Sequence, residues 1–321
     1  MSDSGRLRVT RREALLRLSS TAAAAAALGA GAALFHDRRT VVSGAAVVPD
    51  WRVPSSGGPP AAAARGGDPA ANVRRAVAAL GGIERFVRAG DSVVIKPNVG
   101  WDRIPEQAAN TDPAVVAELV RLCRAAGARR VLVTDISCND PGRCFARSGI
   151  AAAAGAAGAE VIEAPRLRMA PASLPGLSAG LEVVEEVLRA AKVINVPVVK
   201  HHSLSRVTLG MKNWLGVLGK GRNRLHQDIN RAVAELGATF RPTLTLVDAT
   251  RVLAANGPVG GSLADVLPTN AVLAATDPVL ADAWGGALLG HRPAALEFVA
   301  EAERRGLGRS DLALVKELGT V

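Results

Sequence analysis

The chain has 321 residues, enough for one large α/β domain or two coupled lobes in addition to a targeting segment. Its net charge is +10, but seven arginines and three carboxylates among the first forty residues place four of those charges there. Aromatic residues make up only 3% of the chain and no stripe of Lys and Arg accompanies them, which argues against a nucleic-acid binder. The remaining surplus fits an anionic small molecule as ligand, the alternative being a plain solvated basic surface.

The N-terminal forty residues have the order of a twin-arginine signal. Arg11 and Arg12 precede an apolar stretch from Leu15 to Phe35 that is rich in Ala, Leu and Gly. Residues 1–40 are therefore predicted to bring the folded protein to the twin-arginine export machinery, and to remain as a membrane anchor if they are not cleaved. This predicts a periplasmic or other extracytoplasmic location, with membrane contact only through this segment. Residues 41–70, rich in Pro, Gly and Ala, are predicted to be a flexible linker.

After this linker, short β-branched runs alternate with helical patterns. Such alternation is typical of an α/β fold with a mainly parallel sheet flanked by helices in Rossmann-like layers, so residues 71–321 are predicted to form a single domain. Asp112-Pro113 and Asp277-Pro278 predict helix starts, and Gly127 is expected to end the first of these helices. The strands are predicted at Ser92–Lys96, Val131–Asp135, Val193–Val199, Thr243–Asp248 and Asn270–Thr276.

Each predicted strand ends in polar side chains. In open α/β sheets, ligands bind beyond the carboxyl ends of the strands, so these side chains are candidate ligand-binding residues. Each of them alone is equally consistent with a cap or a turn, but five on one predicted edge indicate a site. In chain order they are Lys96 with Asn98, Asp135, Lys200 with His202, Asp248, and Asp277.

The segment from Asn195 to Gly216 is the richest in chemical groups. Lys200 and Lys212 can hold an anion or, with a pKa lowered by burial, serve as base or nucleophile. His202 can transfer protons near neutral pH, and Asn213 follows Lys212 directly. These four residues are the predicted catalytic set.

Three further features of the sequence leave alternatives open. His202, His226 and Asp228 could ligate a divalent metal, although their spacing is not diagnostic, and the loop from Gly219 to Arg224 could close over a ligand. The loop at Asn256 and Gly257 could bring backbone N–H groups to a ligand or be an ordinary turn. Cys138 and Cys144 could form a small disulfide in an oxidising compartment, with metal ligation or redox work as rivals.

Several sequence blocks between about Ser92 and Gly290 together resemble the family of domain of unknown function 362. The resemblance implies an α/β domain, and many members of that family carry an additional ferredoxin-like cysteine block. This chain has three cysteines and so contains no self-contained four-cysteine iron–sulfur site. The matching blocks are Lys96-Pro97-Asn98, Thr111-Asp112-Pro113, Asp135, Asn195 to His202, Val207 to Asn213, Asn256-Gly257-Pro258, and Asp277-Pro278 with Asp282.

A fainter similarity to the nickel-pincer lactate racemases implies that Lys200 and His202 hold a cofactor or a 2-hydroxy acid. Two functional hypotheses follow from the sequence. The first is an exported protein that binds an anionic small molecule or cofactor at the carboxyl edge of its sheet and acts as a redox- or metal-associated enzyme. The second is a non-catalytic binding or maturation protein for a periplasmic redox partner.

Overall fold

The computed structural model describes residues 44–177 and 180–320, and it is built around one ten-stranded sheet. Eight strands follow one another across this sheet, and two more, β9 (Val198–His202) and β10 (Arg206–Thr208), join it beside β11. In sheet order the eight are β13 (Val315–Thr320), β2 (Ala61–Arg65), β12 (Val266–Ala275), β11 (Leu244–Leu253), β8 (Lys192–Val196), β3 (Ser92–Pro97), β4 (Arg130–Val133) and β5 (Glu160–Val161).

The sheet is mostly parallel, which confirms the predicted fold class. Strands β11, β8, β3, β4 and β5 pair in parallel, so their carboxyl ends meet at one edge. Strand β12 runs antiparallel to both of its neighbours, β11 and β2. The carboxyl end of β12 therefore lies at the opposite edge from those of the parallel strands.

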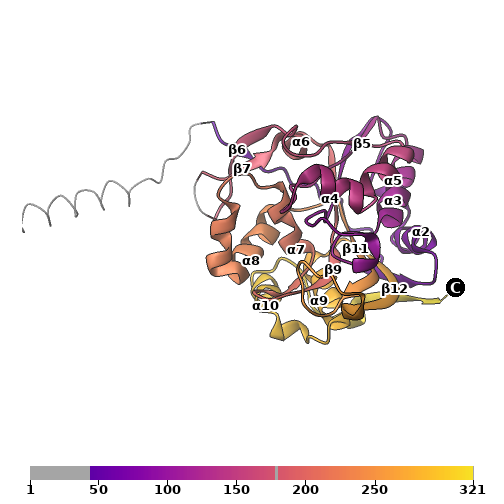
Figure 1. Cartoon of the computed structure of the whole chain (residues 1–321). Helices are drawn as coiled ribbons and strands as arrows, with labels where there is room; N and C mark the ends of the chain where they lie inside the picture. The colour runs from indigo at the N-terminus through magenta and orange to yellow at the C-terminus, as the bar shows by residue number, and fades with distance from the viewer. Residues whose placement is uncertain (1–43, 178–179, 321) are drawn as a thin grey trace, which may run out of the picture. The chain divides into compact units, whose positions relative to one another are not determined.

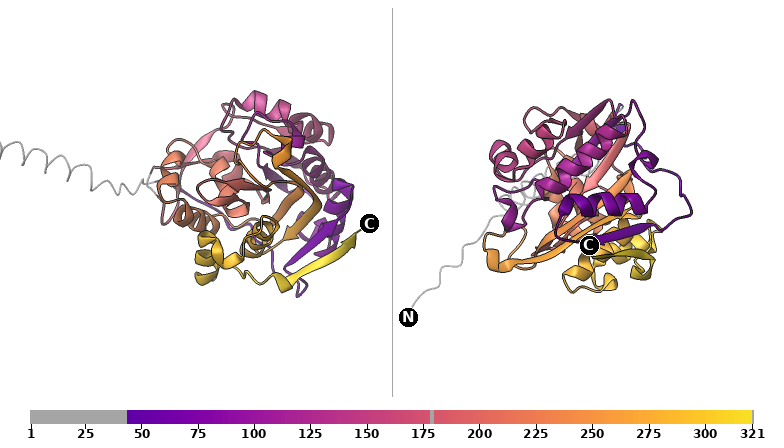
Figure 2. Two further views of the ribbon diagram at one scale, coloured as in Figure 1. Left: turned by 60° about the horizontal axis from the view of Figure 1, so that its bottom comes forward. Right: turned by 90° about the vertical axis from the view of Figure 1, so that its right-hand side faces the viewer.

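Helices cover both faces of this sheet (Figures 1 and 2). Side chains on alternate positions of a strand point to opposite faces, and β2 shows this directly: Ala62 and Ala64 pack into one core cluster, Ala61 and Ala63 into another. The first face carries α2 (Pro69–Ala79), α3 (Pro113–Ala125), α4 (Pro141–Arg147) and α5 (Ile150–Ala156). The second face carries α7 (Gly210–Asn213), α8 (Ile229–Thr239), α9 (Pro278–Leu288) and α10 (Glu297–Arg304).

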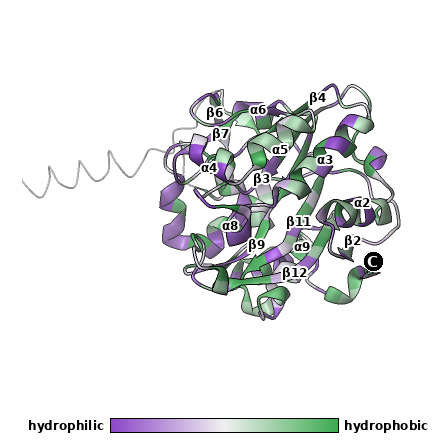
Figure 3. Cartoon of the chain, turned by 45° about the vertical axis from the view of Figure 1, so that its right-hand side comes forward, coloured by the Kyte–Doolittle hydropathy of each residue, from purple (hydrophilic) through white to green (hydrophobic). Residues whose placement is uncertain are grey.

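A small three-stranded sheet and several short helices complete the described part of the chain. The small sheet consists of β1 (Ala46–Val47), β6 (Met169–Ser173) and β7 (Glu182–Val184), followed by α6 (Glu185–Leu188). Colouring by hydropathy shows β9, β11 and β12 largely hydrophobic, whereas α8 has hydrophilic residues on its outside (Figure 3). The 3₁₀ helices are η1 (Ile83–Arg85), η2 (Pro105–Gln107), η3 (Trp214–Val217), η4 (Arg222–Asp228), η5 (Leu263–Asp265), η6 (Pro293–Ala295) and η7 (Leu312–Leu314).

The predicted helix starts are correct. The Asp112 carboxylate accepts a hydrogen bond from Ala114 N at 2.8 Å and begins α3, and Asp277 accepts from Val279 N and Leu280 N and begins α9. Gly127 follows α3 with a positive φ of 84°, the left-handed conformation that ends helices at glycine.

The predicted linker is wrong over its described part. Residues Ala61–Arg65 form β2, which pairs with β12 on one side and β13 on the other, and the indole N–H of the buried Trp51 donates to Ala190 O at 3.0 Å. The compact unit therefore starts at Gly44 and not at residue 71. The predicted signal at residues 1–40 lies outside the described residues. Within residues 44–177 and 180–320, no helix has the length and apolarity needed to span a membrane.

Candidate functional site

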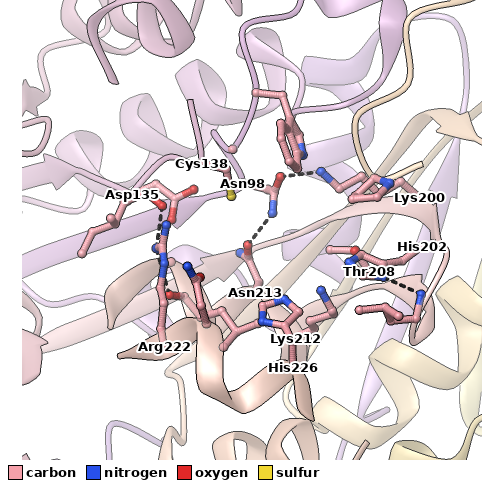
Figure 4. Close-up of a pocket in the computed structure, with 18 of the residues that line it drawn as sticks. Asn98, Asp135, Cys138, Lys200, His202, Thr208, Lys212, Asn213, Arg222 and His226 are labelled. Atoms are coloured by element: carbon pink, nitrogen blue, oxygen red, sulfur yellow. Dashed lines mark hydrogen bonds between the residues drawn. The ribbon is translucent and has the colours of Figure 1, made fainter. Parts of the chain in front are cut away.

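A cavity of about 320 Å³ lies at the carboxyl ends of the parallel strands, between β3, β4 and β9 on one side and α7 and η4 on the other (Figure 4). This is the edge that the sequence predicts. The polar and charged side chains that line the cavity are Asn98, Asp135, Cys138, Lys200, His202, Ser203, Thr208, Lys212, Asn213, Arg222, Asn223 and His226.

A buried ion pair closes one side of this cavity. Lys96, at the end of β3, donates from Nζ to Asp135 Oδ1 at 2.7 Å, and Asp135 Oδ2 accepts from Val99 N at 2.7 Å. Lys96 is fully buried and does not line the cavity, so the structure places it behind the cavity wall and not among the predicted ligand-binding groups. Gly216 allows the close approach, because a Cβ atom there would lie 1.8 Å from Asp135 Oδ1.

Two asparagines connect this ion pair to Lys200. Asn213 Oδ1 accepts from Lys96 Nζ at 3.0 Å and from Asn98 Nδ2 at 2.9 Å. Asn98 Oδ1 in turn accepts from Lys200 Nζ at 2.9 Å, and Ala109 O accepts from the same amine. These bonds fix the Lys200 amine in place but give it no carboxylate partner. Burial lowers the pKa of Lys200 to about 7.

Lys212 is the least satisfied cation of the cavity. Its side chain is only 6% exposed, and no described residue forms a hydrogen bond or ion pair with Nζ. Loss of hydration lowers its pKa to about 8. A buried ammonium group without an acceptor is unfavourable, so this amine gains most from an anionic ligand.

His202 is a neutral imidazole in this arrangement. Its Nδ1 accepts hydrogen bonds from Leu204 N at 3.1 Å and Ser205 N at 3.4 Å, so the ring proton resides on Nε2. Burial, followed by the nearby Lys212 and Lys200, lowers the pKa of His202 to about 3. The ring can donate a hydrogen bond at neutral pH, whereas uptake of a second proton is strongly disfavoured.

A carboxylate behind the cavity holds the helix that carries Lys212 and Asn213. Asp282 on α9 is fully buried and accepts from Gly210 N at 2.6 Å and Met211 N at 3.0 Å, which satisfies the first backbone donors of α7. Burial raises the pKa of Asp282 to about 7.

Arg222 and Thr208 are two of the cavity residues that were not among the predicted site residues. Arg222 begins η4 and donates to Ile136 O at 2.9 Å, Leu215 O at 3.2 Å and Ser137 O at 3.0 Å. Thr208 Oγ1 is buried and has no hydrogen-bond partner among the described residues. Thr208 pairs with Lys200 across the β9–β10 hairpin, so a hairpin assigned around Ser203-Leu204-Ser205 would have placed it in the site.

Three predicted ligand-binding residues lie elsewhere. Asp277 follows the antiparallel β12 and caps α9, also accepting from Arg309 N at 2.9 Å. Asp248 is not at a strand end because β11 continues to Leu253, and its carboxylate accepts from Asp112 N and Thr250 N. Asn256 donates to Asp265, away from the cavity.

The loop beyond Asn256 reaches the cavity in a different way from the one predicted. Gly257 N donates to His201 Nδ1 at 3.2 Å and is thus used within the protein. Pro258, not a glycine N–H, lines the cavity.

The predicted metal ligands do not come together. His202 and His226 both line the cavity, but Asp228 lines a different one beside Arg231. Residues 44–177 and 180–320 contain no group of three or more His, Cys, Asp or Glu side chains placed to hold a metal ion. Cys138 and Cys144 are free thiols in this structure, Cys138 exposed and Cys144 buried, so the disulfide that the sequence leaves open is not formed here.

Comparisons with known proteins bear on this same region. The sequence profile of the domain of unknown function 362 matches residues 93–287, which include every residue that lines the cavity. The thylakoid-associated protein sll1697 of Synechocystis is 29% identical over 251 residues, covering 75% of this chain and 76% of that protein. The lactate racemase apoprotein from Thermoanaerobacterium thermosaccharolyticum aligns with a TM-score of 0.44 and 15% identity over 75% of this chain and 58% of that protein.

Proposed function

We propose that this chain, which belongs to the family of domain of unknown function 362, binds a small anionic molecule in the cavity at the carboxyl edge of its sheet. The observation that carries the proposal is the charge balance of the cavity. Lys200, Lys212 and Arg222 line it together with a single carboxylate, Asp135, and that carboxylate is already paired with Lys96.

An anion would be held by the groups that the protein leaves unsatisfied. Among the described residues, Lys212 Nζ has no acceptor and Thr208 Oγ1 has no partner, and His202 offers its Nε2 proton. Charge-assisted hydrogen bonds from such donors are about twice as strong as neutral ones, and a shielded cavity weakens the competition from water. The unpaired amine of Lys212 is therefore stabilised when an anion is bound.

An enzymatic role follows from the same amines. A lysine whose pKa is about 7 or 8 is partly neutral near physiological pH and can take a proton from a bound substrate, as a general base requires. Lys200 and Lys212 fill this role in our proposal. His202 orients the substrate through its Nε2 proton, and Asn213 positions Lys96 and Asn98 through its own hydrogen bonds.

A second candidate is a non-catalytic binding or maturation protein for a redox partner. It is favoured by the low pKa of His202, about 3, and by the engagement of Asp135 with Lys96, which remove two ordinary acid–base groups. A turnover assay with a 2-hydroxy acid distinguishes the two candidate functions. Proton exchange or conversion of the bound acid supports an enzyme, and tight binding without any turnover supports the non-catalytic protein.

Binding is tested by titration calorimetry of the full chain with acetate, lactate, oxalate and inorganic phosphate as probes. Lys212→Met and Lys200→Met are each expected to weaken binding by about 10- to 100-fold, the effect of losing one charge-assisted hydrogen bond. Lys316→Met, on the exposed strand β13, is the matched control and should leave affinity unchanged. Equal affinities in all four proteins, or no binding of any probe to the wild type, would refute the proposal.

We further propose that the protein works outside the cytoplasm. The proposal rests on Arg11-Arg12 and the apolar stretch from Leu15 to Phe35. Replacing both arginines by lysine retains the charge, so a twin-arginine substrate should then accumulate in the cytoplasmic fraction. Replacement of Arg38 and Arg39 by lysine serves as control. Export that is unaffected by the Arg11/Arg12 change would contradict this location.

A further inference from the structure

A second cavity, of about 580 Å³, adjoins the cationic one. The two share Ile136, Cys138, Arg222 and Asn223 as lining residues, so they meet along one wall. The second cavity has a different character. Apart from the shared residues, five apolar side chains line it, namely Ala164, Pro165, Leu167, Met169 and Leu218. Two charged ones, Glu182 and Lys220, complete the lining together with Gly219 and Gly221.

The small sheet and the loop before η4 build this second cavity. Met169 starts β6, and Glu182 starts β7. The loop is attached to this sheet, because Gly219 N donates to Glu182 O at 2.9 Å and Val183 bridges to Leu218. A Cβ atom at position 219 would lie 2.9 Å from the Met169 methyl carbon, so the glycine leaves room for this flexible side chain against the loop.

Arg222 lies between the two cavities. Its guanidinium donates to three backbone carbonyls, of Ile136, Ser137 and Leu215, which ties η4 to the segment after β4. No carboxylate among the described residues pairs with it. A positive charge at this boundary is suited to an anionic group whose remaining part continues into the apolar cavity.

We infer that the ligand is an anion with an aliphatic chain, the anionic group lying among Lys200, Lys212 and Arg222 and the chain lying against Leu167, Met169 and Leu218. This inference rests on the proposed anion-binding function and adds the substrate class. The apolar wall is the reason for proposing an aliphatic chain on the ligand, because burial of each methylene group stabilises the complex by about 0.8 kcal/mol. An anionic group alone would leave that wall in contact with water.

The experiment is a chain-length series measured by titration calorimetry on the full chain. The probes are n-alkanoates from acetate to octanoate, all below their micelle concentrations. Affinity should rise about fourfold per methylene until the second cavity is filled. In Met169→Gln, which has similar length but a polar end, the increase per methylene should be clearly smaller while acetate binds as in the wild type. Leu263→Gln, at an exposed position outside both cavities, should retain the wild-type slope.

A second variant distinguishes loss of the apolar contact from local misfolding. Met169→Trp places a larger side chain in the second cavity and reduces its free space, so it should lower the affinity for long chains and leave acetate binding unchanged. Melting curves of both variants check that they are folded. A flat chain-length dependence in the wild type, with acetate still bound, would overturn the aliphatic chain but leave the anion site intact. A slope unchanged in both Met169 variants would also overturn it. Failure of every alkanoate and of phosphate to bind would refute the proposed function itself.

Discussion

The charged amine of Lys212 lowers the free energy of unfolding of the ligand-free protein. Its pKa is about 8 in the folded state and about 10.4 in an unfolded chain, so at pH 7 both states are protonated and the folded state pays the full desolvation penalty, on the order of 3 kcal/mol. Lys212→Met retains the apolar stem and removes the charge. We predict a higher melting temperature for this variant than for the wild type at pH 7 without ligand.

The sign of this effect depends on pH. Between about pH 8 and 10.4 the unfolded chain binds more protons than the folded one, so wild-type stability rises with pH across that window and the advantage of Lys212→Met shrinks. Calorimetric melting at pH 7 and pH 9.5 measures both differences. Lys316→Met, at an exposed site, should show neither. A Lys212→Met protein that melts below the wild type at pH 7 would mean that its amine has a partner.

Anion binding should also depend on pH through the lysines of the cavity. Below about pH 7 both Lys200 and Lys212 are protonated in the free protein, so affinity for acetate should be constant there. As pH rises from 7 to 9 first Lys200 and then Lys212 loses its proton, and affinity should fall, by about tenfold for each amine per pH unit above its pKa. Titrations at pH 6, 7, 8 and 9 test this. An affinity that stays flat across the series would exclude the two amines as the anion-binding groups.

At the scale of elements, the strand-end argument worked for β4 and β9 and failed for β11 and β12. It placed Lys200, His202 and Asp135 in one cavity because β9 and β4 end at the same edge. It misplaced Asp277 because hydrophobic pattern does not reveal strand direction, and β12 is antiparallel. It misplaced Asp248 because β11 runs on through polar residues to Leu253. Arg222 needed the tertiary structure, since two of its partners are backbone carbonyls of the distant residues Ile136 and Ser137.

Helix α7 owes its position to a carboxylate on α9. Asp282→Ala would leave the Gly210 and Met211 N–H groups buried without acceptors and free α7 to shift, carrying Lys212 and Asn213 with it. We predict a several-fold loss of acetate affinity along with reduced stability. Asp277→Ala, at the start of the same α9, removes a cap and should cost about 1 kcal/mol of stability with affinity unchanged. Equal affinity losses in the two variants would show that α7 is not positioned by Asp282.

At the scale of the whole molecule, the sheet depends on a segment that composition alone assigns to a linker. Residues 61–65 read Ala-Ala-Ala-Ala-Arg, and alanine is depleted in strands, so no local preference predicts β2. Its four alanines are fully buried, two packing into the core cluster on each face of the sheet. Tertiary packing therefore determines this strand, and β13 can join the sheet only through β2.

This dependence gives a prediction about the boundary of the folded unit. A chain of residues 44–321 keeps β2 and Trp51 and should unfold cooperatively. A chain of residues 71–321 lacks β2. Its loss exposes the edge of β12, leaves β13 without its partner strand and uncovers the core on both faces of the sheet where the alanines of β2 pack. It should be insoluble or show no cooperative transition. Thermal melts of the two chains, followed by circular dichroism, test this prediction. The substitution Ala63→Asp in the chain of residues 44–321 places a charge in the buried part of β2 and should likewise abolish cooperative unfolding. If the chain of residues 71–321 is stable and binds acetate as tightly as the longer chain, the sheet folds without β2 and residues 41–70 act as the predicted linker.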